Sequence, residues 1–482
     1  MNKLWLFIGG GLGIGLLVMV MILATQSSKN GTTALTSKPS NVDESGKTIL
    51  TIWQPIDNED VYKDIVENFE SENPNVKVNI VIKDLKTYER ESTNALSAQI
   101  GPDIWVIPNS WVPRHKDKVV VVPENFFDAE KKKISNLDYV KENFVPIVSK
   151  ELVANNQLQA LPMFIDTLAL YINKTVLKEV EREISQAEQP DEAVLNLIST
   201  GPATWNDLVK LVKAITKVEN GEIIRSAVAL GESTNISHSD DILMAMMLQN
   251  KTQIISPDHQ TATFNLPQTK NSGESYLPGK NAFDFFLSFS NPQTENYTWN
   301  EKMANSQRAF IDGQVAMIID YQYFEQIISQ IDPNVTFKVM ALPQIQGVSD
   351  NETEFKPVDF ASYYNYTVPS TSQNQELAWK FLQYLYSSGG IDSYASATSR
   401  TKPYIFDDVP QSLKDRSERN QPFRFQTLTA ENWYHSKEPN DTVKTIRNMI
   451  NDVNTQKVDS QKALDTGAKL VTDILRSTEN AE

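Results

Sequence analysis

The sequence predicts an α/β protein with more than one domain. Its 482 residues are too many for a single hydrophobic core, and 40% of them are apolar, which is enough to fill large cores. Residues 49–53 and 76–82 have the apolar or alternating patterns typical of strands, and residues 61–69 between them have the spacing of an amphipathic helix. Together they predict a βαβ unit, the building block of sheets covered by helices.

A second group of strand signals lies at residues 160–174, which read ALPMFIDTLALYINK. Pro162 fixes its own φ and disfavours a helical residue before it, so the segment begins extended. Residues 168–172 then alternate as a half-buried strand would. Asp166 is the one charge in the apolar part of this run. Two explanations stay open for it, a carboxylate that caps a backbone turn and an acceptor that faces a ligand.

Composition excludes several classes of function. The formal net charge of −16 and a pI near 4.9 argue against a nucleic-acid partner, because phosphate binding needs a basic surface. The chain has no cysteine, which removes disulfides, thiolate metal sites, cysteine nucleophiles and a lipid-modified cysteine. Its four histidines show no metal-binding spacing. We therefore expect neither a metal nor a cofactor.

The N-terminus predicts a membrane anchor followed by a linker. Residues 4–24 carry no charge, follow Lys3, and as a helix would be about 31 Å long, enough to span the hydrocarbon core. This length favours a retained anchor for residues 1–24, with the body of the protein outside the cell; the alternative is a signal peptide cleaved near residue 24. Residues 25–47 are rich in Ser, Thr, Asn and Gly, as a flexible linker would be.

Candidate ligand-binding residues follow the predicted strands of the first half of the chain. Trp53 ends one strand, and the loop Asn109, Ser110 and Trp111 follows the apolar strand 104–107. Open α/β sheets bind ligands at the carboxyl ends of their strands. Two tryptophans in such positions could hold a sugar ring between them, although core packing would also explain each of them.

The second half of the chain has its own strand and helix signals. Thr204 is a suitable N-cap for a helix over residues 205–215. Residues 227–230 and 315–319 are apolar as buried strands are. Asp320 and Tyr321 follow the second of these strands, where they would offer a polar acceptor and a stacking ring to a ligand.

Several short motifs, in order, resemble one family. They are residues 69–80 (FESENPNVKVNI), 101–105 (GPDIW), 160–174, 202–205 (PATW) and 307–317 (QRAFIDGQVAM). Residues 48–480 are thereby similar to the extracellular solute-binding proteins of sugar-type ABC importers, the family that includes maltose-binding protein. The resemblance implies a two-lobed periplasmic-binding-protein fold of type II, with the ligand cleft between the lobes.

The resemblance also implies that the chain passes between the lobes three times, at residues 160–174, 360–368 and 400–404. The N-terminal lobe would comprise residues 48–164 and 360–400, and the C-terminal lobe residues 165–359 and 401–482. We call these the first and second lobes. Asp166 would then lie at the lobe junction, and Tyr364 on the second crossing. Ser372 is expected to cap the helix that follows.

Late in the chain, Trp433 and Tyr434 precede the C-terminal helices. In the maltose-binding branch of the family, an aromatic pair in this place packs against the sugar. The two residues match that pair in type and placement, whereas the flanking residues differ. The resemblance therefore implies a tethered, monomeric receptor that binds a carbohydrate and delivers it to the permease subunits of an ABC transporter.

Other functions remain as alternatives. Asp166 and Asp320 could be paired carboxylates of a glycosidase, but the chain has no nucleophile elbow and no metal spacing. Adjacent tyrosines can ligate ferric iron in related two-lobed receptors, and Tyr363 and Tyr364 are such a pair in this sequence. Neighbouring residues on a strand face opposite ways, however, which argues against a shared iron. A polyamine, a phosphate ester or a peptide are further non-sugar ligands of two-lobed receptors.

Overall fold

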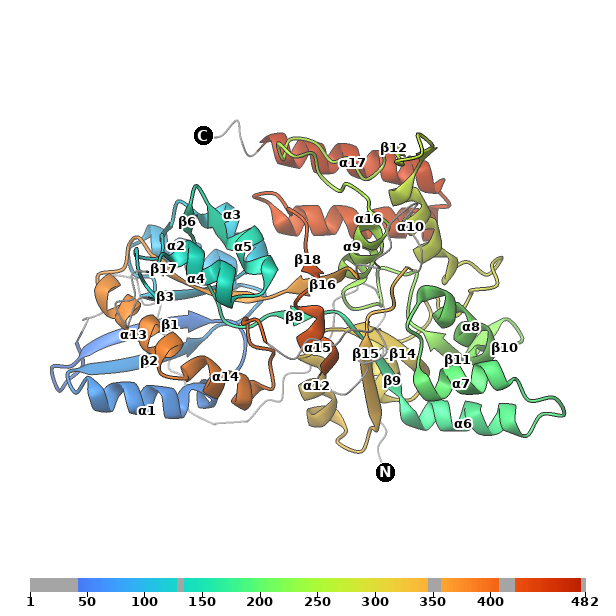
Figure 1. Ribbon diagram of the computed structural model, residues 1–482, viewed down its shortest axis with the longest axis horizontal. Coiled ribbons are helices and arrows are strands. Elements are labelled where there is room, and N and C mark those ends of the chain that lie inside the picture. Colours follow the sequence, from blue (N-terminus) through green and yellow to red (C-terminus); the bar gives the residue numbers. More distant parts are fainter. Residues whose placement is uncertain (1–41, 128–133, 346–356, 407–420, 478–482) are drawn as a thin grey trace, which may run out of the picture.

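The computed structural model describes residues 42–127, 134–345, 357–406 and 421–477. Figure 1 shows two lobes that lie side by side along the longest axis, each built around a β-sheet with helices on its faces. Each lobe has its own hydrophobic core. The predicted two-lobed α/β architecture is therefore confirmed.

The first lobe contains a six-stranded sheet with the order β2-β1-β3-β17-β4, in which β7 also pairs with β17. Its strands are β1 (Thr48–Gln54), β2 (Val76–Ile82), β3 (Ile104–Pro108), β4 (Val119–Val120), β7 (Leu161–Pro162) and β17 (Tyr364–Pro369). β1 is parallel to both β2 and β3, whereas β17 runs antiparallel to β3. The expected βαβ unit is present, and it is completed by a strand from far along the chain.

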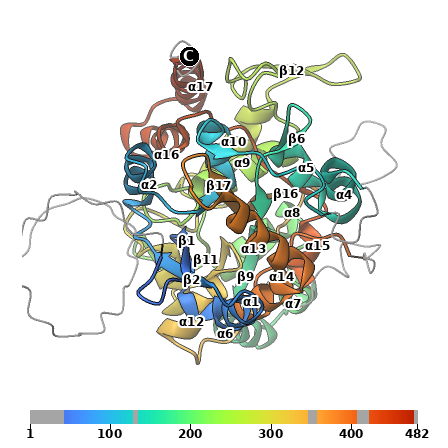
Figure 2. The same cartoon turned by 90° about the vertical axis from the view of Figure 1, so that its left-hand side faces the viewer.

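Helices cover both faces of this sheet: in Figure 1, α2, α3 and α5 lie above it and α1, α13 and α14 lie below it. Figure 2 shows the last three helices toward the viewer. Ile65 and Phe69 form the buried stripe of α1, and the Asn73 side chain donates to the Phe69 carbonyl where the helix ends. The helices of this lobe are α1 (Lys63–Glu72), α2 (Tyr88–Ser97), α3 (Val112–His115), α4 (Asn136–Asn143), α5 (Pro146–Leu152), α13 (Gln375–Ser387) and α14 (Gly390–Thr398). Short 3-10 turns, Glu59–Tyr62 and Asn109–Trp111, precede α1 and α3, and β5 (Val153–Ala154) pairs with β6 (Gln157–Leu158).

The second lobe contains a five-stranded sheet with the order β10-β11-β14-β9-β15. Its strands are β9 (Ala169–Asn173), β10 (Lys217–Glu219), β11 (Glu222–Val228), β14 (Val315–Asp320) and β15 (Phe337–Ala341). β9 and β14 are buried along their whole length, because helices cover both faces of the sheet. The half-buried alternation expected after residue 168 is therefore wrong: Leu168 breaks the chain into two short strands, and both faces of β9 are buried.

The helices of the second lobe include the two at the C-terminus. They are α6 (Lys174–Ser185), α7 (Glu192–Thr200), α8 (Trp205–Ile215), α9 (Ser239–Gln249), α10 (Pro278–Ser288), α11 (Ser306–Ile311), α12 (Phe324–Ile331), α15 (Gln421–Gln426), α16 (Pro439–Gln456) and α17 (Ser460–Ser477), and β12 (Gln268–Thr269) pairs with β13 (Ser275–Tyr276) beside them. Thr204 caps α8 as predicted, since its hydroxyl accepts from the Asp207 N–H at 3.2 Å. The strand expected at residues 227–230 begins and ends earlier in the structure, where it is β11, Glu222–Val228.

The lobes are joined by a three-stranded sheet of β18 (Ala430–Glu431), β16 (Asp359–Ser362) and β8 (Asp166–Thr167), near the middle of Figure 1. β8 leads from β7 into β9, and β16 leads back into β17. The third passage differs in detail from the expectation. Residues 403–405 still pair with the first lobe, since Val145 N–H donates to the Pro403 carbonyl at 3.0 Å, and the strand that returns at the junction is β18.

One predicted helix cap is wrong. Ser372 does not cap α13, because Asn374 occupies the N-cap position. The Ser372 hydroxyl instead donates to Asp103 at 2.7 Å and accepts from the Asn374 N–H at 3.1 Å. Ser372 therefore fastens the loop before α13 to the first sheet.

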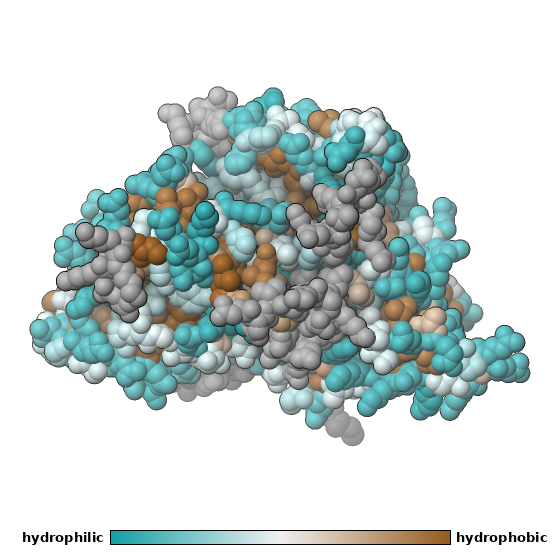
Figure 3. Space-filling model, in the orientation of Figure 1, coloured by the Kyte–Doolittle hydropathy of each residue, from teal (hydrophilic) through white to brown (hydrophobic). Residues whose placement is uncertain are grey.

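Figure 3 shows a mostly hydrophilic surface on which hydrophobic residues form small groups, some of them where the lobes meet. Among the residues that the structure describes, no helix combines the length and apolar character needed to cross a membrane. The proposed anchor, residues 4–24, lies outside the described residues.

Candidate functional site

The strand registers place two loop clusters at the junction between the lobes. Tyr364, which follows the crossing strand β16, pairs with Pro108 at the carboxyl end of β3. Ala169, which follows the crossing strand β8, pairs with Asp320 at the carboxyl end of β14. Because both partners adjoin a crossing strand, these carboxyl ends face the junction. This is the edge at which open α/β sheets bind ligands.

An ion-pair network occupies the junction on the side of the first lobe. Arg400, which follows α14, donates to Asp57 at 3.0 Å and lies 3.7 Å from Asp166 of β8. All three side chains are at most 8% exposed. The Arg400 guanidinium also lies 4.2 Å from the Phe164 ring centroid, and Tyr394 donates to Asp57. The network therefore ties the loop after β1 to a crossing strand.

Asp166 both caps backbone and joins this ion pair. Its Oδ1 accepts from the Gln322 N–H at 2.7 Å, and Oδ2 lies 3.4 Å from the Tyr323 N–H. Burial raises the pKa of Asp166 to about 6, although the charge of Arg400 and these backbone donors lower it. The explanation of Asp166 as a turn cap is thus supported. Its place between the lobes also fits the other explanation.

The second lobe contributes a buried cluster around Asp320. The Asp320 carboxylate accepts from the Gln307 amide at 2.9 Å, and His238 Nε2 lies 3.6 Å from it. The same histidine nitrogen is 2.7 Å from the Tyr323 hydroxyl. Burial raises the pKa of Asp320 to about 7 and lowers the pKa of His238 to about 4. At neutral pH the cluster therefore presents a neutral imidazole beside a carboxyl group whose protonated form burial favours.

Tyr321 is almost fully buried beside this cluster, at 3% exposure. Its hydroxyl donates to Asp241 Oδ2 at 2.8 Å, and its ring meets the His238 ring edge to face. Burial also raises the pKa of Asp241, as does the neighbouring charge of Asp240. Tyr321 thus supports the wall of the site from behind. Tyr323, which is half-buried, takes the more open position.

The two tryptophans of the first lobe lie in different environments. Trp53 is half-buried, and Lys83 Nζ lies 3.8 Å above its ring centroid. Trp111 is 8% exposed and stacks on Tyr88 with a centroid separation of 6.0 Å. One face of Trp53 is therefore occupied by a lysine, and Trp111 packs into the core. This arrangement does not form the open pair of rings expected from the sequence.

Asn109 and Ser110 lie in the loop between β3 and α3. Asn109 is 7% exposed; its amide donates to Glu151 at 3.0 Å, and its carbonyl oxygen accepts from the Tyr363 N–H at 3.2 Å. The Tyr363 hydroxyl also donates to Glu151. Burial raises the pKa of Glu151 to about 7. Asn109 thus holds the loop in place, and the half-buried Ser110 is the more open of the two.

Tyr363, which lies between β16 and β17, and Tyr364, which begins β17, have different partners, as adjacent residues of an extended chain should. Tyr363 bonds to Glu151, whereas Tyr364 lies near Arg400 and Phe164. Burial raises the pKa of Tyr364 to about 12.

Among the described residues, no three or more histidines, aspartates or glutamates are grouped as metal ligands would be.

The aromatic pair Trp433 and Tyr434 follows β18, separated from it by Asn432. Both residues are half-buried against the core of the second lobe. The Trp433 ring meets His435 edge to face at 4.5 Å, and Tyr434 stacks on His259 at 4.4 Å with an interplanar angle of 14°. Tyr434 already has a stacking partner within the protein. Trp433 is the better candidate for a face that a ligand could use.

One family model matches residues 54–391, and its description is bacterial extracellular solute-binding protein. The chain belongs to this family. The family is described as one of proteins that bind solutes outside the cell.

Solved structures with the same fold cover most of the chain. A sugar-binding protein from Xanthomonas citri is 16% identical with a TM-score of 0.66 and covers 90% of this chain and 98% of its own. A protein from Arthrobacter globiformis that binds cyclic alpha-maltosyl-1,6-maltose is 16% identical with a TM-score of 0.67, and the match covers 90% of this chain and 100% of that protein. A solute-binding protein from Thermotoga lettingae TMO, solved with alpha-D-tagatose, is 19% identical with a TM-score of 0.63, and the match covers 89% of this chain and 99% of that protein.

Four residues at the junction were not predicted as site residues: Asp57, His238, Tyr323 and Arg400. Asp57 follows β1 as Asn109 follows β3, so the rule that selected Asn109 would also have selected Asp57. Tyr323 lies two positions after Tyr321 and could have been found in the same way. Nothing in the spacing of the sequence pointed to His238 or Arg400.

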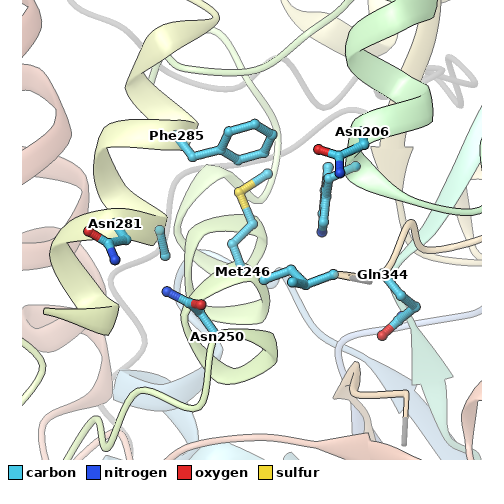
Figure 4. A pocket seen from close by; sticks show the side chains of 9 residues that line it. Asn206, Met246, Asn250, Asn281, Phe285 and Gln344 are labelled. Atoms are coloured by element: carbon cyan, nitrogen blue, oxygen red, sulfur yellow. The ribbon is translucent and has the colours of Figure 1, made fainter. Parts of the chain in front are cut away.

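A separate pocket of about 210 Å³ lies within the second lobe, between α8, α9 and α10. In Figure 4, the amides of Asn206, Asn250 and Asn281 surround the side chains of Met246 and Phe285. None of the residues that line it was predicted as a site residue. The Asn250 amide already donates to the Pro278 carbonyl at 2.7 Å.

Proposed function

We propose that the chain is a receptor that holds a sugar or oligosaccharide between its two lobes and delivers it to an ABC transporter. Membership of the solute-binding family supports a binding role. Several structures with this fold are described as binding sugars, among them the alpha-D-tagatose complex and the maltotetraose complex of a cyclo/maltodextrin-binding protein. The Thermotoga lettingae protein is described as an ABC transporter solute-binding protein, which supports such a transporter as the partner.

The observation that carries this proposal is the set of acceptors and rings that both lobes place at the junction. Asp57 of the first lobe, Asp166 of the crossing strand β8 and Asp320 of the second lobe have buried carboxylates there, and Tyr323 presents a half-buried ring. Sugars need such acceptors for their hydroxyl groups and apolar surfaces for their ring faces. The proposed site comprises Trp53, Ser110, Asp166, Asp320, Tyr364, Trp433 and Tyr434, supported from behind by Asn109, Trp111 and Tyr321, and the geometry adds Asp57, His238, Tyr323 and Arg400.

The proposed ligand site works by closure of the lobes. The crossing strands β8, β16 and β18 are short, and they form the hinge between two lobes with separate cores. A ligand that contacts both lobes stabilises the closed arrangement by the difference between its affinities for the two forms. We further propose that the protein works as a monomer on the extracytoplasmic face of the membrane.

A thermal-shift screen against mono- and oligosaccharides tests the sugar proposal. A sugar at about 100 times its Kd stabilises the protein by about 2.7 kcal/mol, which gives a clear rise in Tm. Spermidine, inorganic phosphate, ferric salt and a peptide mixture belong in the same screen, because buried carboxylates also suit a cationic solute. A rise with one of these and none with any sugar contradicts the sugar proposal. Chromatography of an oligosaccharide after incubation with the protein distinguishes a receptor from a glycosidase, because only a glycosidase releases shorter sugars.

A further inference from the structure

A second set of polar contacts connects the lobes, away from the Arg400 network. It joins the helices α2 and α3 of the first lobe to the start of α16 in the second. Arg114 of α3 donates to the carbonyl of Lys437 at 2.8 Å and to the carboxylate of Glu438. Asn440 of α16 donates to Glu89 of α2 at 3.1 Å. Figure 1 shows α3 and α16 on the same side of the molecule.

Arg114 is at the centre of these contacts. Its Nε lies 3.1 Å from Glu89 Oε1, so one guanidinium bridges a carboxylate of its own lobe and one of the other lobe. His115 Nε2, 3.2 Å from the same Glu89 oxygen, holds that carboxylate in position. Burial opposes the charge on Glu89, but the hydrogen bond from His115 and the charge of Arg114 keep its pKa below the usual value. Glu89 is thus a ready acceptor for Arg114 and Asn440.

The position of this bridge relates it to ligand entry. α3 follows the loop Asn109–Trp111, and α2 follows β2, so Glu89 and Arg114 lie at the carboxyl edge of the first sheet. Lys437 and Glu438 follow Trp433 by a few residues on the facing lobe. A contact across these two edges exists only when the lobes are close together. It is lost when they separate.

We propose that Arg114, Glu89, Glu438 and Asn440 form an interlobe latch that stabilises the closed arrangement without touching the ligand. Arg114 is then a positioning residue for binding, because a protein that is closed for more of the time binds a closure-dependent ligand more tightly. The side chains of Arg114 and Glu438 are 28% and 40% exposed, so water and salt reach them. The latch can therefore open for exchange of the solute.

The latch can be tested without a ligand, because the full chain has no cysteine. Lys86→Cys and Lys444→Cys place one spin label on each lobe at exposed positions next to the latch. Double electron–electron resonance then measures the distribution of distances between the two spin labels, and so between the lobes. We expect Glu438→Gln to reduce the ratio of closed to open molecules by about two- to fivefold, as loss of a partly exposed ion pair should. Arg114→Met should reduce it at least as much.

Glu183→Gln is the matched control. Glu183 accepts from Arg225 at 2.8 Å, is 51% exposed, and belongs to the second lobe together with its partner. Its loss should leave the distances unchanged. High salt should shift the unsubstituted latch toward open and should shift Glu438→Gln less. The latch would be overturned if the unsubstituted protein and Glu438→Gln gave identical distance distributions, or if Glu183→Gln gave the same shift as Glu438→Gln. The inference depends on the proposed closure of the lobes but not on the sugar, so a failed sugar screen leaves this result interpretable.

Discussion

The carboxylate of Asp166, on the crossing strand β8, accepts a hydrogen bond of 2.7 Å from the backbone N–H of Gln322. Gln322 lies in the loop that follows β14 of the second lobe. One side chain of the connecting strand thus holds a loop at the site, and Arg400 binds the same carboxylate from the first lobe. Any change at this point affects both the junction and the loop that carries Tyr323.

We expect Arg400→Met to destabilise the protein by about 3 kcal/mol or more. The substitution leaves the buried carboxylates of Asp57 and Asp166 without their cation, and loss of one partner of a buried pair is costly. Denaturant unfolding followed by tryptophan fluorescence measures the free energy of unfolding.

Arg308→Met is the control for this experiment. Arg308 pairs with Asp312 one turn away on the second lobe, and its side chain is 59% exposed. We expect it to change the free energy of unfolding by less than about 0.5 kcal/mol. If Arg400→Met and Arg308→Met were equally mild, the junction network would not stabilise the fold.

The stability of the protein should depend on pH through Asp320. Its pKa is raised from 3.8 to about 7 in the folded protein, chiefly by burial. A carboxyl group with a raised folded pKa stabilises the fold while it is protonated, and this contribution is lost as pH rises from about 4 to about 7. Asp320→Asn does not titrate. The difference in free energy of unfolding between the wild type and Asp320→Asn should therefore fall by about 2–4 kcal/mol over that range.

Comparison with the variant is needed because other groups titrate in the same window. Burial lowers the pKa of His238 and of His435 to about 4, and a buried neutral histidine makes stability rise with pH between about 4 and 6.5. The contribution of His435 cancels in the difference between two proteins that share it. His238 Nε2 lies 3.6 Å from Asp320, so the comparison is made in a His238→Gln background, in which this residue does not titrate. A difference that stayed constant from pH 4 to pH 7 would show that Asp320 is ionised throughout.

Local signals in the sequence predicted the start of α8 correctly and the start of α13 wrongly. Thr204 was recognised as the cap of α8 because the chemistry of a helix start involves residues three positions apart. The carboxyl ends of β3 and β14 were found in the same way, from apolar runs that stop at polar residues. The crossings came from the family resemblance, because their partners in the sheet, such as Asp359 and Ala430, are far apart in the chain.

Contacts between distant segments could not be predicted. Arg400 and Asp57 are 343 positions apart, and no periodicity relates them. Trp53 and Trp111 looked equivalent in the sequence, yet Lys83 covers one and Tyr88 stacks on the other. The identity of a residue shows what it can bind. Its neighbours in space decide whether it is free to do so.

The N-terminal segment should hold the protein on the membrane. The full chain is expected in the membrane fraction, because residues 4–24 are uncharged and long enough to span the bilayer. A chain that begins at Thr48, the start of β1, keeps both lobes and should be soluble and bind the same ligand. Cell fractionation and N-terminal sequencing measure this. A mature protein that begins at residue 25 or 26 would contradict the anchor.

Trp433→Ala should weaken ligand binding about tenfold or more and change the Tm of the unliganded protein little. The Trp433 ring is half-buried and meets His435 edge to face, and an aromatic platform contributes roughly 1–3 kcal/mol to binding. Trp299 is the control, since it is fully buried and donates to Asn235 at 3.0 Å. Trp299→Ala should lower the Tm strongly, because it leaves a cavity in the second lobe. Calorimetric titration with the sugar found in the thermal-shift screen, together with thermal unfolding, measures both quantities. If Trp433→Ala behaved like Trp299→Ala, with lost stability and unchanged affinity, Trp433 would be a core residue and the stacking face would have to be sought at Tyr323.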